Sequence, residues 1–112
     1  MPAVLSPQDL SEDALKLIAA RFKALSEPNR LKLIIALEDG EKNVGDLIEL
    51  TGLKQANVSR HLQTLTDAGI LSRHRNGLAV IYSIADSSIF LMCRQVCGGI
   101  QSRLKHQVKA LS

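Results

Sequence analysis

The sequence predicts a mainly α-helical domain with one small β-hairpin. Apolar residues recur near a 3.6-residue period in separate segments of the 112-residue chain, which indicates about five amphipathic helices. Two of these segments are joined by a short turn headed by glycine, a pattern typical of a helix-turn-helix. An Asn-Gly dipeptide between two β-prone runs predicts the hairpin.

Length, charge and cysteine content narrow the class of protein. With 112 residues and a net charge of +3, we expect one soluble domain over residues 1–112, near the size at which a second subunit often completes the core. No apolar run is long enough to span a membrane, and the N-terminal stretch MPAVLSPQDLSED lacks the features of a signal peptide. A cytoplasmic location follows as an expectation. In that reducing compartment, the two cysteines are not expected to form a permanent disulfide.

Local capping signals bound the first three predicted helices. The SPQD stretch that begins at Ser6 predicts the start of a helix that runs to about Leu25. A second, shorter helix covers residues 31–37. Asn43, with an acidic residue three positions on, predicts the N-cap of a third helix over residues 44–51, which glycine ends.

The fourth predicted helix follows Lys54 and ends at Gly69, so that the helix-turn-helix covers residues 44–69. One of its faces is apolar, and the opposite face carries Ala56, Arg60, Gln63 and Asp67. Small and polar side chains let a helix approach the major groove, where amides pair with adenine and arginine pairs with guanine or phosphate. A merely solvated helix face would more often show Glu and Lys pairs four residues apart, so this face favours DNA binding.

The predicted hairpin covers residues 71–84, with Asn76 and Gly77 as the central residues of a type I′ turn. Arg73 and Arg75 alternate onto one of its faces. An arginine pair in a hairpin is commonly only solubilising. Its position directly after the fourth helix instead indicates a wing that contacts the DNA backbone.

Four motifs, taken together, resemble the ArsR/SmtB family of bacterial winged helix-turn-helix repressors. They are Ala24–Leu31, Val44–Leu47, Val58–Leu65 and Ala68–Leu71. The resemblance covers roughly Leu17 to Ile84. It implies a homodimer built on the first and last helices, which binds an imperfect inverted repeat in double-stranded promoter DNA and leaves it when an inducer arrives.

The resemblance and the helix face together nominate nine DNA-binding residues. They are Lys54, Gln55, Ala56, Asn57, Ser59, Arg60, Gln63, Arg73 and Arg75. Lys54 departs from the family, which often has serine there as the N-cap, but it places a cation where a phosphate would pass. For His61, at the edge of the apolar face, we expect a packed or hydrogen-bonded structural role.

The family's known inducer sites are incomplete here. Family members with the metalloid site carry a Cys-x-Cys pair in the third helix, and that helix has no cysteine here. Members with a zinc site in the last helix carry Asp and His at its start and a second pair further on. Asp86 could match the first ligand, but Ser88, Gly99 and Ser102 stand at the other positions. Persulfide-sensing members pair the last helix with a cysteine of the second helix, which is missing.

Cys93 and Cys97 are then the candidate sensor residues, on a last helix over residues 88–111. They share one stripe with Ile89, Val96, Ile100, Leu104, Val108 and Leu111. Three interpretations stay open: thiol redox or persulfide sensing, a soft metal or metalloid ion held across the dimer, and burial as small hydrophobic side chains. Their Cβ atoms should lie about 5 to 6 Å apart, beyond the ~3.8 Å typical of a disulfide. Gly98 and Gly99 should soften the helix beside them.

The sequence thus predicts a homodimeric repressor that uses the last helix as dimerisation and sensor helix. No resident cofactor is expected, other than the soft metal or metalloid ion that Cys93 and Cys97 would hold in the second interpretation. His74 and His106 are expected to be solvated. A winged-helix protein-interaction module that binds no DNA is the alternative from another class. An enzyme is not expected, because no nucleophile with a nearby base, paired carboxylates or phosphate loop is evident.

Overall fold

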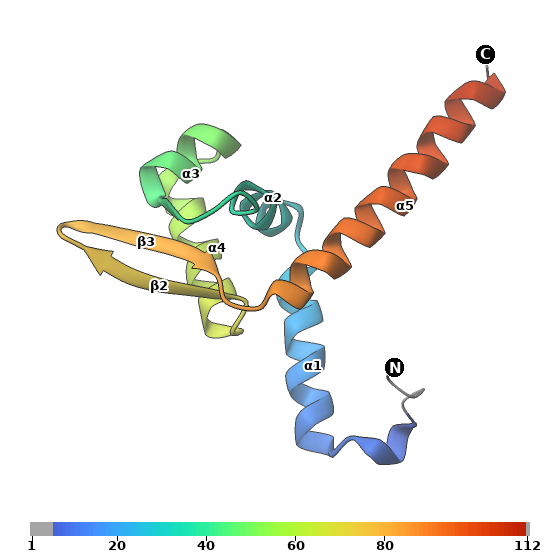
Figure 1. The fold of residues 1–112 in the computed structure, drawn as a ribbon, viewed down its shortest axis with the longest axis horizontal. Coiled ribbons are helices and arrows are strands. Elements are labelled where there is room, and N and C mark those ends of the chain that lie inside the picture. The colour runs from blue at the N-terminus through green and yellow to red at the C-terminus, as the bar shows by residue number, and fades with distance from the viewer. Residues whose placement is uncertain (1–5, 112) are drawn as a thin grey trace.

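The computed structural model describes residues 6–111 and has the predicted mainly helical architecture (Figure 1). The elements are η1 (Pro7–Asp9), α1 (Glu12–Leu25), α2 (Pro28–Ala36), β1 (Lys42–Asn43), α3 (Val44–Thr51), α4 (Gln55–Asp67), β2 (Leu71–Asn76), β3 (Ala79–Ile84) and α5 (Ser87–Leu111). The predicted fold class, a winged helix-turn-helix, is confirmed.

The predicted start of the first helix is wrong. The Asp9 carboxylate does accept bonds from the backbone N–H of Ser6 at 2.7 Å and from its hydroxyl at 3.0 Å, but these close a single 3-10 turn. Leu10 is extended and interrupts the helix. Ser11 then caps α1 by accepting a bond from the N–H of Ala14 at 3.1 Å. Two consecutive capping signals, at Ser6 and Ser11, therefore divide the predicted helix into η1 and α1.

The core lies where α2, α3 and α4 meet the small sheet. Its fully buried side chains are Leu33, Ile34, Leu47, Val58, Leu62, Leu65 and Ile70. The predicted bounds of the third helix and its Asn43 cap are confirmed, since the Asn43 side chain accepts a bond from the N–H of Asp46 at 2.8 Å. Gly52 ends α3 with φ +71°, a conformation that glycine adopts without strain. The predicted second helix is confirmed, although Ile35 is 51% exposed and does not join the core.

The sheet has three strands in the order β1-β3-β2, and the two-residue strand β1 was not predicted. In the hairpin, Asn76 pairs with Ala79, so the central turn residues are Gly77 and Leu78 rather than Asn76 and Gly77. Gly77 has φ +66° and Leu78 does not have a positive φ, which is the pattern of a type II′ rather than a type I′ turn. The bounds predicted for the wing, 71–84, are those observed.

Helices α1 and α5 extend away from this core as two diverging arms (Figure 1). Asp86, just before α5, links the two helices. Its carboxylate accepts bonds from the N–H of Ser88 at 3.0 Å and from the Ser88 hydroxyl at 2.5 Å, and it forms an ion pair with Arg21 of α1. Among the described residues, no helix is long and apolar enough to cross a membrane.

Candidate functional site

The polar face of α4 is open to solvent. Exposed side chains at its start and along this face are Lys54, Gln55, Ala56, Ser59, Arg60 and Gln63, and Asn57 is half-buried beside them. The Lys54 side chain makes no capping bond to the helix, so its ammonium group is free to extend outward. Arg60 donates a bond to the Asn57 side-chain oxygen at 3.4 Å. The opposite face, with Val58, Leu62 and Leu65, is buried as predicted.

One side-chain hydrogen bond joins the wing to this face of α4, and a second, within α4, holds the residue that accepts it. Arg73 of β2 donates to the Gln63 side-chain oxygen at 3.1 Å, and the Gln63 amide nitrogen donates to Asp67 at 2.8 Å. Arg73 and Arg75 are both exposed on the same strand. The structure therefore brings Arg73 of the wing into contact with Gln63 of the predicted helix face, and Arg75 is exposed two residues further along the same strand.

His61 has the structural role that was predicted. It is only 4% exposed, and its Nδ1 accepts a bond from Arg30 Nε of α2 at 3.2 Å. The neutral ring then carries its proton on Nε2, which lies 3.5 Å from the Glu27 carboxylate. Burial, aided by the guanidinium groups of Arg60 and Arg30, holds the pKa of His61 below its ordinary value against the opposing effect of Glu27.

Arg30 extends this link to α1, because it also donates to the backbone carbonyl of Ala24 at 3.3 Å. One side chain of α2 thus connects the end of α1 to α4. Sequence reasoning missed Arg30 and Glu27 as functional candidates. Both lie in the Ser26–Leu31 stretch, so a motif was visible, but nothing in the sequence pairs them with His61.

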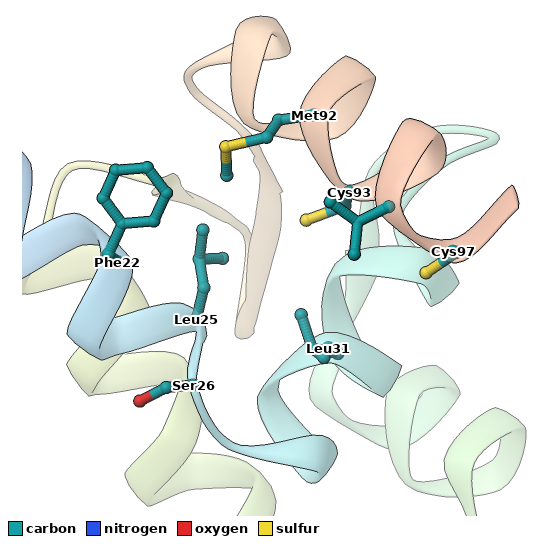
Figure 2. Close-up of a pocket in the computed structure, with 8 residues that line it drawn as sticks. Phe22, Leu25, Ser26, Leu31, Met92, Cys93 and Cys97 are labelled. Carbon is teal, nitrogen blue, oxygen red and sulfur yellow. The ribbon is translucent and has the colours of Figure 1, made fainter. Parts of the chain in front are cut away.

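Cys93 is buried and Cys97 is half-buried, both on α5. Burial, together with the neighbouring Cys97 sulfur, raises the pKa of the Cys93 thiol. Both cysteines line a cavity of about 260 Å³ between α1, α2 and α5, which we call the cysteine cavity (Figure 2). Its lining residues are Phe22, Leu25, Ser26, Leu31, Met92, Cys93, Val96 and Cys97.

The apolar stripe of α5 has no cover within one chain, both at the open side of this cavity and beyond it. Val96 and Phe22, which line the cavity, are more than half exposed, as are Ile100 and Leu104 of α5 and Leu17 of α1. The side chains of Val108 and Leu111, assigned to the same stripe, and of His106 lie outside the described residues. His74 is half exposed, as predicted, with Glu41 at 3.8 Å.

Within the part of the chain that the structure describes, no three or more His, Cys, Asp or Glu side chains gather as they would around a metal ion. Asp86, the one match to the zinc site of the last helix, instead caps α5 and pairs with Arg21. Ser88, at a second position of that site, is the residue that Asp86 caps.

Similarity to known proteins agrees with this geometry. A family model described as "Bacterial regulatory protein, arsR family" matches residues 27–73. The HTH-type transcriptional regulator Rv0081 of Mycobacterium tuberculosis is 39% identical over 80 residues, which cover 70% of each chain. Its crystal structure matches with a TM-score of 0.71, at 33% identity, over 88% of this chain and 99% of that one.

Two further solved structures are similar over nearly the whole chain. The homodimeric winged helix-turn-helix domain of Mb0332 from Mycobacterium bovis matches with a TM-score of 0.77, 27% identity, and 94% and 95% coverage of the two chains. The antimony-specific repressor AntR matches with a TM-score of 0.75, 30% identity, and 93% and 99% coverage.

The fold and the polar surface define a winged helix-turn-helix DNA-binding protein. These similarities place it more closely: the chain belongs to the ArsR/SmtB family of transcriptional repressors.

Proposed function

We propose that this chain is a homodimeric repressor whose two α4 helices enter successive major grooves of an imperfect inverted repeat. The observation that carries this proposal is the exposed, small and polar face of α4, joined to the wing by the Arg73–Gln63 bond. In a dimer of this kind the two recognition helices lie about 34 to 36 Å apart, one turn of DNA. The whole chain acts as one domain in this proposal, with α5 as its dimerisation and sensor helix.

The contacts divide by chemistry. Gln55, Asn57 and Arg60 offer amides and a guanidinium group to base edges, and Ala56 and Ser59 allow close approach of the backbone. Lys54, Arg73 and Arg75 supply phosphate contacts, which add affinity without sequence preference. Gln63 serves mainly to hold Arg73 toward the DNA, since its side chain is bonded on both sides.

Release of the DNA is assigned to thiol chemistry at Cys93 and Cys97. The cysteine cavity touches α1, α2 and α5, so a modified sulfur would press on the helices that join the DNA-reading part to the dimer arms. A second candidate is a soft metal or metalloid ion held by the same thiols across the dimer. The similarity to antimony-specific AntR favours that candidate.

DNA binding is tested by fluorescence anisotropy with DNA from upstream of the protein's own gene. We expect Arg60→Ala and Arg75→Ala to weaken binding, and Arg75→Ala to lower the slope of log affinity against log salt by about 2, since each subunit of the dimer loses one phosphate contact. Arg103→Ala removes the same charge from an exposed position on α5 and is the matched control. Affinity unchanged by all three substitutions would favour the protein-interaction module.

Sensing is tested with the same DNA at fixed salt. Protein exposed to peroxide or polysulfide should lose affinity, and a reductant should restore it. The variants Cys93→Ser and Cys97→Ser should keep binding DNA but lose the response. A full response in both variants would overturn the thiol assignment, and a metal titration with loss of affinity would support the second candidate.

A further inference from the structure

The cysteine cavity has the size and lining of a binding site for a small organic molecule. Its volume of about 260 Å³ exceeds the ~150 Å³ of an apolar protein cavity that takes up benzene. Phe22 and Leu25 of α1, Leu31 of α2 and the sulfur atoms of α5 face the same space in Figure 2. Three helices of one chain form its walls, and its outer side, where Phe22 is 56% and Val96 is 58% exposed, is open in a single chain.

The lining of the cavity carries no charged side chain and disfavours a charged ligand. None of the eight lining side chains is ionised in its ordinary state at neutral pH, and the hydroxyl of Ser26 already donates to the Lys23 carbonyl at 2.8 Å. A charged ligand would lose its hydration without gaining a partner, which is strongly unfavourable. The Phe22 ring and the Met92 and Cys93 sulfurs offer polarisable contacts instead. This environment suits an uncharged apolar molecule.

The two thiols suit a reaction that needs only one sulfur atom. Both lie in the continuous helix α5, where residues four apart have Cβ atoms about 5 to 6 Å apart, too far for a disulfide without unwinding. The chain has no other cysteine. Cys97 is half-buried, whereas Cys93 is buried, so Cys97 is the more accessible of the two cysteines that line the cavity.

We propose that the cysteine cavity captures a small, uncharged, apolar electrophile of the α,β-unsaturated carbonyl class, to which Cys97 adds. The sulfur forms a bond to the β carbon, the carbon–carbon double bond becomes single, and the proton of the thiol ends on the α carbon. No oxidant or reductant is required. This inference rests on the proposed function in one respect, that the adduct weakens DNA binding.

A structural route leads from the cavity to the recognition helix. Leu25, Ser26 and Leu31 line the cavity at the α1–α2 junction. Directly beside them, Ala24 and Arg30 are joined by the 3.3 Å bond, and Arg30 holds His61 of α4 at 3.2 Å. An adduct that widens the junction would therefore strain the bonds that position α4.

The test uses the full-length reduced protein and two reagents with the same reactive group. One is N-ethylmaleimide, which is uncharged, and the other is a maleimide that carries a sulfonate. Each labelling rate at Cys97 is read by mass spectrometry of the peptides after digestion, which separates it from labelling at Cys93, and is divided by the rate with a small free thiol. We expect N-ethylmaleimide to label Cys97 at least about tenfold faster, because the sulfonate must be desolvated to enter.

Two further experiments test whether labelling depends on the cavity itself. N-ethylsuccinimide, the unreactive saturated analogue, should slow labelling by N-ethylmaleimide only. Leu31→Phe should fill the cavity and slow the same reaction, while Leu50→Phe adds the same ring at an exposed position away from it. The succinimide experiment uses the unchanged protein, so the test holds even if Leu31→Phe does not fold. Equal rates for both reagents, as expected if Cys97 is reached from the second hollow beside Glu38 and Arg94, would overturn the inference.

DNA anisotropy on the labelled protein separates this inference from the proposed function. If the unlabelled protein binds no DNA, the proposed function fails, and selective labelling still supports the cavity. If the unlabelled protein binds DNA and labelling is unselective, the inference alone fails. Selective labelling that leaves DNA affinity unchanged would overturn the assignment of the adduct as an effector.

Discussion

The DNA-reading part of the molecule and its two arms, α1 and α5, differ in how well one chain buries their apolar side chains. In the reading part, formed by α2, α3, α4 and the sheet, Leu62 and Leu65 are fully buried. On the arms α1 and α5, Leu17 is 70% and Leu104 is 54% exposed. A single chain therefore closes the core beneath the DNA-binding surface but leaves the apolar arm faces uncovered. These uncovered apolar faces are what the proposed homodimer would bury, with the arms of one copy packed against those of the other.

Leu62→Ala tests the reading part and should have the largest effect. Leu62 is fully buried on α4, so truncation removes apolar contacts and leaves a cavity. We expect the free energy of unfolding to fall by about 2 to 5 kcal/mol. Chemical denaturation followed by circular dichroism measures this. A loss below about 1 kcal/mol would mean that the core is less tightly packed than the structure shows.

Leu104→Ala tests the arms. If α5 packs against a second copy, dimer formation buries the exposed half of each Leu104, worth about 1.5 to 3 kcal/mol for the two copies together. The dimer dissociation constant should rise at least about tenfold, while the fold of each chain is kept. Sedimentation equilibrium measures the constant, with the exposed polar change Gln95→Ala as control. Equal constants for both variants would contradict the arms as the dimer interface.

Lys54→Ser should separate stability from DNA binding within the reading part. Lys54 stands at the N-cap of α4 with extended backbone but makes no side-chain capping bond. Serine there should add one and stabilise the protein by about 1 kcal/mol. Loss of the ammonium group should weaken DNA binding and lower its salt dependence. Asn43→Ala is the opposite control, because it removes the α3 cap, costs about 1 kcal/mol, and should leave DNA contacts in place.

His61→Gln should have the smallest effect and acts at the boundary between the two parts. The pKa of folded His61 lies below its ordinary value of 6.5, so the unfolded chain takes up a proton first as the pH falls. The free energy of unfolding should therefore decline below about pH 6.5, until the folded ring is also protonated. Denaturation at several pH values should show a shallower decline in His61→Gln. An unchanged profile would mean that His61 does not contribute to this pH dependence.

The reading part was predictable from sequence because local signals bound its elements. Asn43 and Gly52 bracket α3, and the apolar spacing of Val58, Leu62 and Leu65 orients α4. Such signals act over a few residues and are visible in one chain.

The features that sequence missed depend on distant partners. The register of the hairpin is set by the whole ladder between β2 and β3, which continues to a bond from the Ala85 N–H to the Ile70 carbonyl at 2.9 Å. A rule based on the Asn-Gly dipeptide alone does not include these distant pairs. Strand β1 exists only because Lys42 and Asn43 meet β3. The cysteine stripe was evident, but the walls of its cavity come from α1 and α2, and periodicity along α5 says nothing about them.

The sheet order leaves β2 at an edge, with β3 between it and the short β1. Unpaired backbone groups along an edge strand invite another chain to add on, and natural proteins oppose this with positive charge there. Arg73 and Arg75 lie on that strand, so the side chains proposed to hold phosphate also protect the protein from aggregation. Neutral variants of the wing should therefore be checked by light scattering before a lost DNA signal is read as a lost contact.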